Sequence, residues 1–340
     1  MKKIAAVIIT DTHLKESNIK IVVSIFRQAI SFCLENKIDT IYHLGDIFDS
    51  RKSQPLLILN TFREILDEVH SNEISLVAIC GNHEKTSYNE VSSFLHPFLH
   101  HPAFVLIDSY FKMPLTENVT VHFLPFFADD IYNEMLKLVQ IDSIISNHDI
   151  LFTHIGISGA RMNNGQIVEG IAKSSFEMFE FIISGHYHDK QIFDKFNYIG
   201  STIQHNYGET PDKGLTVLYN DLTWETVELE FPRYHKIEVD VDKLTNSEIE
   251  EIKKVKEETG DNLRVILVGS EAKVKSFNKQ LLLNEGISVE HKIEEVVKEQ
   301  LEERTNPFTS TSLVIEFEKY CKKNNLNEKE GKKYLYLVVN

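Results

Sequence analysis

Aspartate, histidine and asparagine residues stand directly after short apolar runs of this chain, where their side chains could bind metal ions. They are Asp11, His13, Asp46, Asn82, His83, His154, His186 and His188. Carboxylate, imidazole and amide oxygen together suit a pair of divalent ions such as manganese, iron or zinc, and the lack of cysteine at these positions argues against a structural zinc site. A carboxylate such as Asp46 can bridge two ions, because each of its oxygens can bind one.

Each motif alone also has an ordinary explanation. "DTH" (11–13) could be two solvated loop residues, "GD" (45–46) is common turn chemistry, and "GNH" (81–83) could be a turn with a left-handed asparagine. "GHYH" (185–188) by itself is evenly balanced between a metal site and an ordinary loop. All of the motifs in this order, each behind an apolar run, favour a metal site.

Apolar, β-branched runs separate these motifs and are expected to be strands that are buried on both faces. They span residues 4–10, 40–45, 75–81, 119–126, 149–156, 179–185 and 213–220. Apolar residues at helical spacing lie between them, over 19–33 and from near 53 to 69. This alternation indicates a layered α/β sandwich. In such a fold, residues just past the carboxyl ends of successive strands converge on one crevice, so distant motifs become neighbours.

Composition indicates a globular protein without a membrane span. The 340 residues are 42% hydrophobic, and no run approaches the ~18 apolar residues that a span needs. The three cysteines are scattered, which fits a reducing cytoplasm. The net charge of −15 argues against a protein that coats nucleic acid. Most of the acidity lies in residues 1–232, with 17 basic and 30 acidic residues, where bound metal would balance part of it.

The chain divides into three predicted parts. Residues 1–232 form the large α/β domain, and from "RYHKIEVDV" on the pattern restarts as a compact α/β unit over 233–293 with helices at 246–258 and 271–284. Residues 294–340 are mostly helical, and "SLVIEFEKYCKKN" presents an apolar helix face. That face either packs on its own domain or docks a partner.

The ordered motifs resemble those of the calcineurin-like metallophosphoesterases. That family has the signature D-x-H, G-D, G-N-H-D/E, a lone histidine and G-H-x-H, and this chain reads "DTH", "GD", "GNHE", "THIG" and "GHYH". The resemblance covers residues 7 to about 220. It implies a four-layered αββα sandwich that holds two divalent ions.

Carried onto this chain, the resemblance implies a ligand set for each ion. One set is Asp11, His13, Asp46 and His188. The other set is Asp46, Asn82, His154 and His186, which makes Asp46 the bridge. His83 would not bind metal; it would face the phosphate and act as general acid or stabilise charge on the leaving group. Two ions ~3.5 to 4 Å apart would lower the pKa of a bound water and neutralise charge on the phosphoryl oxygens.

Two further stretches resemble the SbcD-type nucleases, the catalytic subunits of double-strand-break repair complexes, which include a T-even phage form. They are "GDIFDSRKSQP" (45–55) and "YIGSTIQHNYGE" (198–209). The resemblance implies a capping domain that shapes access for DNA, a homodimer through helices near 19–34 and 55–70, and a C-terminal region that binds an SMC-like ATPase. Ordinary core packing explains those helix faces equally well. The chain departs from the group where "DTHLK" replaces D-x-H-L-G.

The sequence therefore predicts a manganese-dependent DNA nuclease, both exonuclease and endonuclease, within an ATPase complex of recombination or double-strand-break repair. Four basic residues near the motifs either contact backbone phosphates or are solvated charges: Arg51, Lys52, Arg161 and Lys190. Two alternatives remain open, a stand-alone metallophosphoesterase acting on nucleotides, cyclic nucleotides or phosphoproteins, and a metal-free scaffold with the same fold. We expect a cytoplasmic protein, acting in the host cytoplasm if it is phage-encoded.

Overall fold

The computed structural model describes residues 2–142, 148–162, 165–293 and 322. Contacts within the chain divide it into two compact units, Met1–Lys292 and Ile293–Asn340. Nearly all of the second unit lies outside the described residues. The predicted helical region over 294–340 and its docking role therefore stay predictions.

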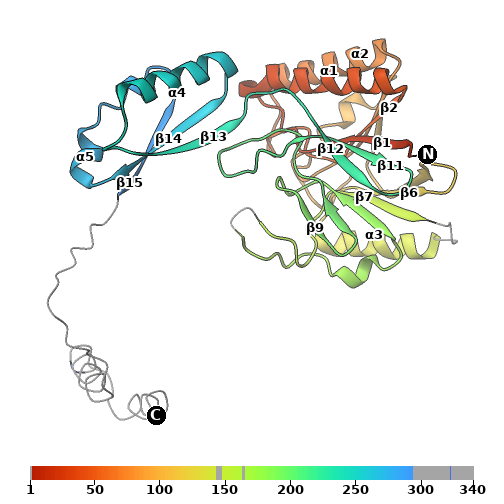
Figure 1. The fold of residues 1–340 in the computed structure, drawn as a ribbon. Coiled ribbons are helices and arrows are strands. Elements are labelled where there is room, and N and C mark those ends of the chain that lie inside the picture. The colour runs from red at the N-terminus through yellow and green to blue at the C-terminus, as the bar shows by residue number, and fades with distance from the viewer. Residues whose placement is uncertain (1, 143–147, 163–164, 294–321, 323–340) are drawn as a thin grey trace. The chain divides into compact units, whose positions relative to one another are not determined.

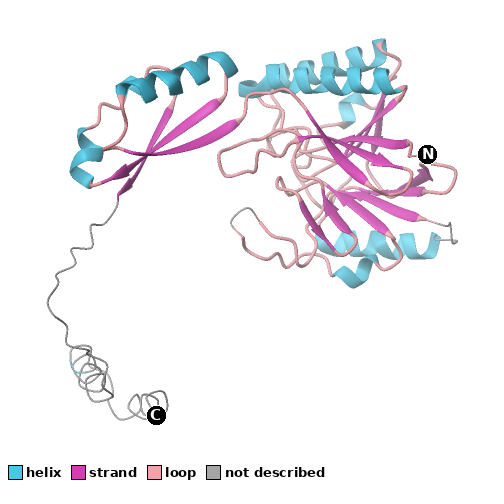
Figure 2. Ribbon diagram, viewed as in Figure 1, coloured by secondary structure: helices cyan, strands magenta, loops and turns pink. Residues whose placement is uncertain are grey.

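Two six-stranded sheets make up most of the first unit (Figures 1 and 2). The first has the order β12 (Trp224–Glu228), β11 (Gly214–Tyr219), β1 (Ile4–Ile9), β2 (Thr40–His43), β3 (Ser75–Ile79), β4 (Phe104–Ile107). The second has the order β5 (Phe111–Pro114), β6 (Thr120–Leu124), β7 (Asp149–Thr153), β8 (Phe181–Ser184), β10 (Phe196–Tyr198), β9 (Gln191–Phe193). Four adjacent strands of each sheet are parallel: β1 to β4 in the first, and β6, β7, β8 and β10 in the second.

The two sheets share a core between them. Ile8 and Tyr42 of the first sheet are buried there with Phe123 and Phe152 of the second. The ring centroid of Tyr42 lies 5.9 Å from that of Phe123 and 5.7 Å from that of Phe152. Because helices cover the other face of each sheet, the strands are apolar on both faces, which explains their continuous apolar runs.

Helices form the two outer layers (Figure 1). On the first sheet, α1 (Ile19–Asn36) and α2 (Leu56–Ser71) bury Phe26 and Phe62. On the second, α3 (Asp129–Asp142) buries Tyr132. Three short 3-10 helices lie in the connections: η1 (Glu16–Asn18), η2 (His96–Phe98) and η3 (Lys173–Phe176). The layers confirm the predicted α/β sandwich of two sheets between helices.

The segment Glu16–Asn36 has the length and apolar composition of a membrane span. In the structure, however, Val22, Phe26 and Ile30 of this segment are buried in the core against the first sheet. A helix that packs on a sheet needs such an apolar stripe. We therefore interpret α1 as a core helix.

A third sheet follows, with the order β13 (Tyr234–Asp240), β14 (Asn262–Gly269), β15 (Ser288–Ile293). The buried side chains of β14 alternate along the strand and pack with α4 (Asn246–Thr259), α5 (Glu271–Ser276) and α6 (Gln280–Leu283). The helix predicted over 271–284 is two helices, because Phe277 after α5 adopts an extended conformation (φ −64°, ψ 132°). The boundary at residue 232 and the capping role of this unit stay predictions.

Candidate metal centre

The predicted metal-site residues all lie just beyond the carboxyl ends of parallel strands, drawn from both sheets. Asp11 and His13 follow β1, Asp46 follows β2, Asn82 follows β3, His154 follows β7, and His186 and His188 follow β8. Residues far apart in the chain meet there, since His13 and His188 are separated by 175 positions and their Nε2 atoms are 3.1 Å apart. The crevice that the strand pattern predicts is therefore present.

Four of these residues have left-handed backbones. The φ angles are 49° at Asp11, 44° at His13, 55° at Asp46 and 88° at His186. A left-handed backbone at a non-glycine residue costs about 1–3 kcal/mol, so it persists only where surrounding contacts offset that cost. Such strained residues cluster at functional sites. Backbone hydrogen bonds hold two of these conformations: the Asp11 N–H donates to the Gly45 carbonyl (3.0 Å), and the His13 N–H donates to the Asp46 carbonyl (3.1 Å).

The four predicted ligands of one ion, which we call the first group, converge around His13. They are Asp11, His13, Asp46 and His188. His13 Nε2 lies 3.1 Å from His188 Nε2, 3.7 Å from Asp46 Oδ2 and 3.9 Å from Asp11 Oδ1. Two imidazole nitrogens this close need a proton between them, whereas a cation among these atoms would accept a lone pair from each.

The predicted ligands of the other ion, which we call the second group, converge around Asn82. They are Asp46, Asn82, His154 and His186. Asn82 Oδ1 lies 3.2 Å from His154 Nε2 and 3.0 Å from His186 Nδ1, and His154 Nε2 lies 3.3 Å from Asp46 Oδ2. A reversed Asn82 amide would instead donate to both rings and accept from Arg51. The oxygen-inward orientation is the one that a cation requires.

The charges buried in this centre favour a cation. Asp11 and Asp46 are both buried, and burial raises the pKa of Asp11. Burial lowers the pKa of His154, but the charges of Asp46 and Asp11 outweigh it and raise that pKa to about 9. Without an ion, His154 thus carries a proton that balances the carboxylates. An ion has to displace this proton, so its binding should weaken as the pH falls.

The donor atoms present fit divalent ions. Burial lowers the pKa of His13 and lowers that of His186 to about 3, so both imidazoles are neutral, as a ligand must be. The described part of the chain has three sets of residues whose donor atoms, one from each residue, lie within 4.8 Å of one another. Asp46 belongs to two of them, one with His13 and His83 and the other with Asp11 and His154. Divalent ions bound there would activate a water molecule and neutralise charge on a phosphoryl group. The ligand assignments themselves stay predictions.

Glu84 supports Asp46 from behind. Its buried carboxylate accepts from the N–H groups of Asp46 (2.9 Å), Gly81 (2.7 Å) and Phe48 (2.9 Å). Burial raises the pKa of Glu84 to about 7. Only glycine fits at position 81, because a Cβ there would lie 2.2 Å from Asp46 Oδ1. Glu84 therefore fastens the "GD" loop to the "GNHE" loop, a role that the motif letters alone do not reveal.

A cavity of about 290 Å³ opens onto both groups. Its lining comprises His13, Asp46, Asp49, Arg51, Asn82, His83, His186, His188 and His205. His83 Nδ1 lies 2.5 Å from the Asp49 carbonyl oxygen, and His83 Nε2 lies 2.8 Å from Arg51 Nη2. Since arginine only donates, Nε2 accepts and Nδ1 carries the proton. His83 is thus held at the cavity wall by contacts with Asp49 and Arg51.

The four basic residues predicted near DNA have different surroundings. Arg51 lines the cavity, and Lys52 beside it is exposed. Arg161 is exposed and does not line the cavity. Lys190 forms an ion pair with Asp212 (2.6 Å) and lines a separate hollow with Trp224. Arg51 is therefore the one of the four that faces the metal centre.

Sequence reasoning missed two residues near the first group, His205 and Glu209. His205 lines the cavity, and Glu209 Oε1 accepts from His188 Nδ1 (2.8 Å). A carboxylate in this position orients a metal-binding imidazole. Both lie in the quoted stretch "YIGSTIQHNYGE", but nothing in their spacing shows that this stretch returns to the strand ends.

Comparison with known families identifies the family of the chain that carries this centre. Residues 5–190 match the sequence profile described as Calcineurin-like phosphoesterase, which is more than half of the chain. The chain belongs to the calcineurin-like phosphoesterase family. This confirms the resemblance read from the motifs, and it makes the chain a phosphoesterase of a family that uses divalent metals.

Two viral proteins are similar to this phosphoesterase. "Putative phosphoesterase 244L" of Invertebrate iridescent virus 6 is 26% identical over 282 residues, covering 80% of this chain and 96% of that protein. "Exonuclease subunit 1" of Enterobacteria phage T4 is 25% identical over 183 residues, so the match spans 52% of this chain and about half (51%) of that protein. A solved dimetal phosphatase from Danio rerio overlaps 63% of this chain and 91% of that one at 10% identity, with a TM-score of 0.45 that is too low to support an inference.

We expect His188→Ala to weaken the binding of one ion by at least about tenfold and to leave the other in place, because His188 contacts only the first group. Calorimetric titration with Mn²⁺ and elemental analysis measure the affinity and the number of ions. His100→Ala, which removes an exposed histidine, is the matched control. Two ions bound at wild-type affinity in His188→Ala would refute the assignment.

Proposed function

We propose that this phosphoesterase is a two-metal DNA nuclease, with exonuclease and endonuclease activity, that uses manganese as the catalytic subunit of an SbcCD-like complex. The observation that carries the proposal is the arrangement at the cavity, where two groups of predicted metal ligands share Asp46, and His83 and Arg51 line the same cavity. The similarity to the phage T4 exonuclease subunit supports DNA as the substrate.

The residues around the cavity have separate parts in such a reaction. Asp46 lies against both groups and would hold both ions at a fixed separation. Arg51 presents its guanidinium at the cavity, where it would bind the oxygens of the scissile phosphate. Once Arg51 binds the phosphate, His83 Nε2 would be free to take up a proton from solvent, and the resulting imidazolium would donate that proton to the leaving oxygen.

The decisive experiment is cleavage of end-labelled linear duplex DNA with Mn²⁺, with wild type compared to His83→Ala. Cleavage by wild type that disappears in the variant supports a nuclease with its chemistry at this centre. If wild type cleaves a small phosphodiester efficiently but does not cleave DNA, with or without a co-purified ATPase, the nuclease proposal fails.

Arg51→Ala should lower kcat/KM for DNA about 10- to 100-fold, since a hydrogen bond to a charged group is worth about 1.5–3 kcal/mol. The loss should be the same for all DNA sequences, because phosphate contacts carry no sequence information. Lys190→Ala is the matched control, since its ammonium is paired with Asp212 outside the cavity. Steady-state kinetics on several duplexes give the values, and an unchanged kcat/KM in Arg51→Ala would contradict the role.

A second candidate is a stand-alone phosphoesterase acting on nucleotides, cyclic nucleotides or phosphoproteins. The relative from the iridescent virus favours it, because that protein is named a phosphoesterase and matches over 96% of its length. The same cleavage experiment separates the two, if the small phosphodiester is included as a substrate. The third possibility, a metal-free scaffold, requires that purified protein binds no ion.

We propose an SMC-like ATPase and a second copy of this chain as partners, and the cytoplasm of a host cell as the place of action. Helices α1 and α2 support the homodimer, since Leu34, Leu56 and Leu57 on them are 50%, 72% and 54% exposed. The viral origin of both relatives supports the host cytoplasm. Light scattering on purified protein tests the dimer, and a monomer at micromolar concentration would contradict it.

A further inference from the structure

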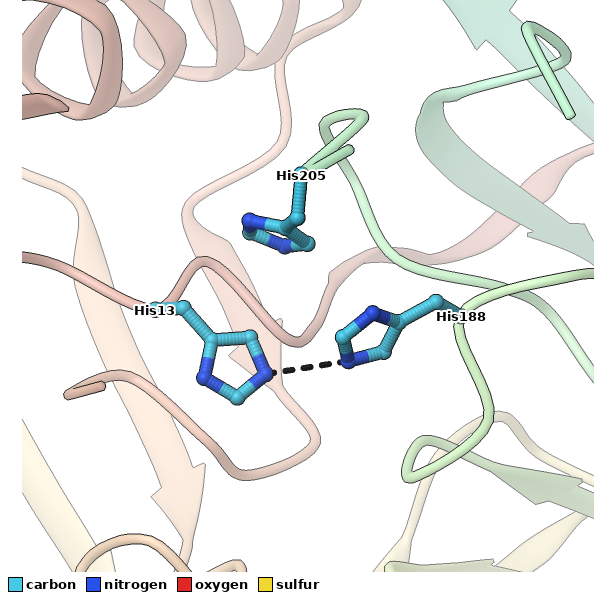
Figure 3. A group of neighbouring side chains, drawn as sticks. All are labelled: His13, His188 and His205. Atoms are coloured by element: carbon cyan, nitrogen blue, oxygen red, sulfur yellow. Dashed lines mark hydrogen bonds between the residues drawn. The ribbon is translucent and has the colours of Figure 1, made fainter. Parts of the chain in front are cut away.

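His205 lies beside the first group, although it comes from a different part of the chain. It follows β10 and stands outside residues 5–190, which match the family profile. Its ring centroid is 4.8 Å from that of His13 and 4.9 Å from that of His188, and the three rings face a common space (Figure 3). The ring nitrogens of these three residues lie within 4.8 Å of one another.

His205 is linked by hydrogen bonds to Asp11 and, through Glu209, to His188. Its Nε2–H donates to the backbone carbonyl of Asp11 (2.7 Å), and its backbone N–H donates to Glu209 Oε2 (2.9 Å). The other oxygen of Glu209 accepts from His188 Nδ1 (2.8 Å). His205 and Glu209 thus form a continuous chain of hydrogen bonds from the end of β1 to the loop after β8.

The hydrogen bond from His205 is accepted by the backbone of a strained residue, Asp11. Asp11 has φ 49°, and its carboxylate accepts from the His186 N–H as well as from Thr10. A contact with the Asp11 carbonyl therefore helps to hold the backbone from which the Asp11 carboxylate extends into the first group. Partners of this kind, one step removed from the metal, change its affinity about 10- to 100-fold.

The second group is held by other contacts. His154 Nδ1 donates to the Leu44 carbonyl (2.7 Å), and Glu84 holds the loops that carry Asp46 and Asn82. None of these bonds involves His205, which can reach the second group only through the Asp11 carboxylate and the His186 N–H. Loss of the His205 ring should therefore affect the two ions unequally.

We propose that His205 is a positioning residue for the ion of the first group and affects that ion more strongly than the other. This inference rests on the two-metal centre of the proposed function. His205 is assigned a positioning role because its Nε2–H is directed at the Asp11 carbonyl. Its Nδ1 keeps a lone pair, so the variants below also test whether His205 binds the ion directly.

The test is Mn²⁺ binding to the full chain, measured by calorimetry together with electron paramagnetic resonance, for wild type, His205→Ala and His205→Gln. We expect His205→Ala to weaken one of two ions about 10- to 100-fold and to weaken the second much less. His205→Gln should keep wild-type affinity, since its side-chain amide can still donate to the Asp11 carbonyl. His291→Ala, which removes an exposed histidine of β15, is the matched control.

A double variant, in which His205→Ala is added to Asn82→Ala, identifies which ion is affected. Asn82→Ala should weaken only the ion of the second group, so adding His205→Ala to it should weaken the remaining ion as well. Thermal melting in the presence of a chelator shows whether each variant is folded. The equal loss of both ions in His205→Ala would overturn the proposal, because it would indicate a general effect on the fold.

Three other outcomes also overturn the inference, and they can be told apart. Unchanged Mn²⁺ binding in His205→Ala refutes it and leaves the proposed function intact. If His205→Gln loses the ion as His205→Ala does, and the spin-echo signal of one bound imidazole nitrogen disappears, His205 is a ligand. If wild type binds no Mn²⁺, the two-metal centre of the proposed function is wrong, and this inference fails with it.

Discussion

Asp46→Ala should release both ions and lower phosphodiester turnover by at least about 10³-fold, because bound metal supplies several kcal/mol of transition-state stabilisation. Asp46 Oδ2 lies 3.3 Å from His154 Nε2 in the second group and 3.7 Å from His13 Nε2 in the first. Asp11, the other predicted carboxylate ligand, lies 3.9 Å from His13 Nε2 and contacts His186 of the second group at its backbone N–H. Removing Asp46 should leave each group without its shared anion.

Elemental analysis and Mn²⁺ titration of Asp46→Ala give the number of ions that remain. Asp49→Ala is the matched control, because this carboxylate also lines the cavity but is not a predicted ligand, and it should keep two ions. Thermal melting with chelator present separates loss of ions from loss of fold, since breaking a buried ion pair can itself cost about 3–5 kcal/mol. One ion bound at wild-type affinity in Asp46→Ala would show that Asp46 does not bridge.

His83→Ala should keep both ions and lose about 10²- to 10⁴-fold in kcat, which is the usual contribution of a general acid or base. His83 lines the cavity, and its Nε2 faces Arg51 at 2.8 Å, where a substrate phosphate would enter. Its Nε2 is also 3.8 Å from Asp46 Oδ2, close enough to be counted among possible donor atoms. Measuring ion content and turnover on the same sample therefore decides between a proton donor and a ligand.

His83→Gln is the informative second variant. Its amide can still contact Arg51 and the Asp49 carbonyl but cannot transfer a proton, so it should be as inactive as His83→Ala if His83 is the acid. Near-normal turnover in either variant, or loss of ions in both, would contradict the assigned role. Combining His83→Ala with Arg51→Ala should give less than the sum of the two losses, because the residues are in direct contact.

Much of this centre could be predicted from the sequence because the relevant signal is local. Short apolar runs that end in glycine or threonine, followed at once by Asp, His or Asn, place those side chains at strand ends. Parallel strands then bring such ends to one edge. Asp11, Asp46 and His154 are far apart in the chain, yet this reasoning predicted that they would be neighbours.

The contacts that tune the site could not be predicted in this way. Arg51 was only one of four basic candidates, and it is distinguished by its place in the cavity lining and its contact with His83. The helix expected over 271–284 is interrupted, because the extended backbone at Phe277 overrides the helical spacing of the apolar residues. Neither outcome is encoded in the periodicity of nearby residues.

The sequence by itself determined the residue types, their order along the chain and the strands that they follow, since these depend on local propensity and the alternation of elements. It therefore determined the fold class and the divalent-metal phosphoesterase chemistry that the family shares. Only the tertiary structure decided that His205 reaches back to the Asp11 carbonyl, that Glu209 orients His188, and that Glu84 joins two loops. The physical reason is that these bonds link segments as much as 194 positions apart, and their geometry exists only after both sheets have packed.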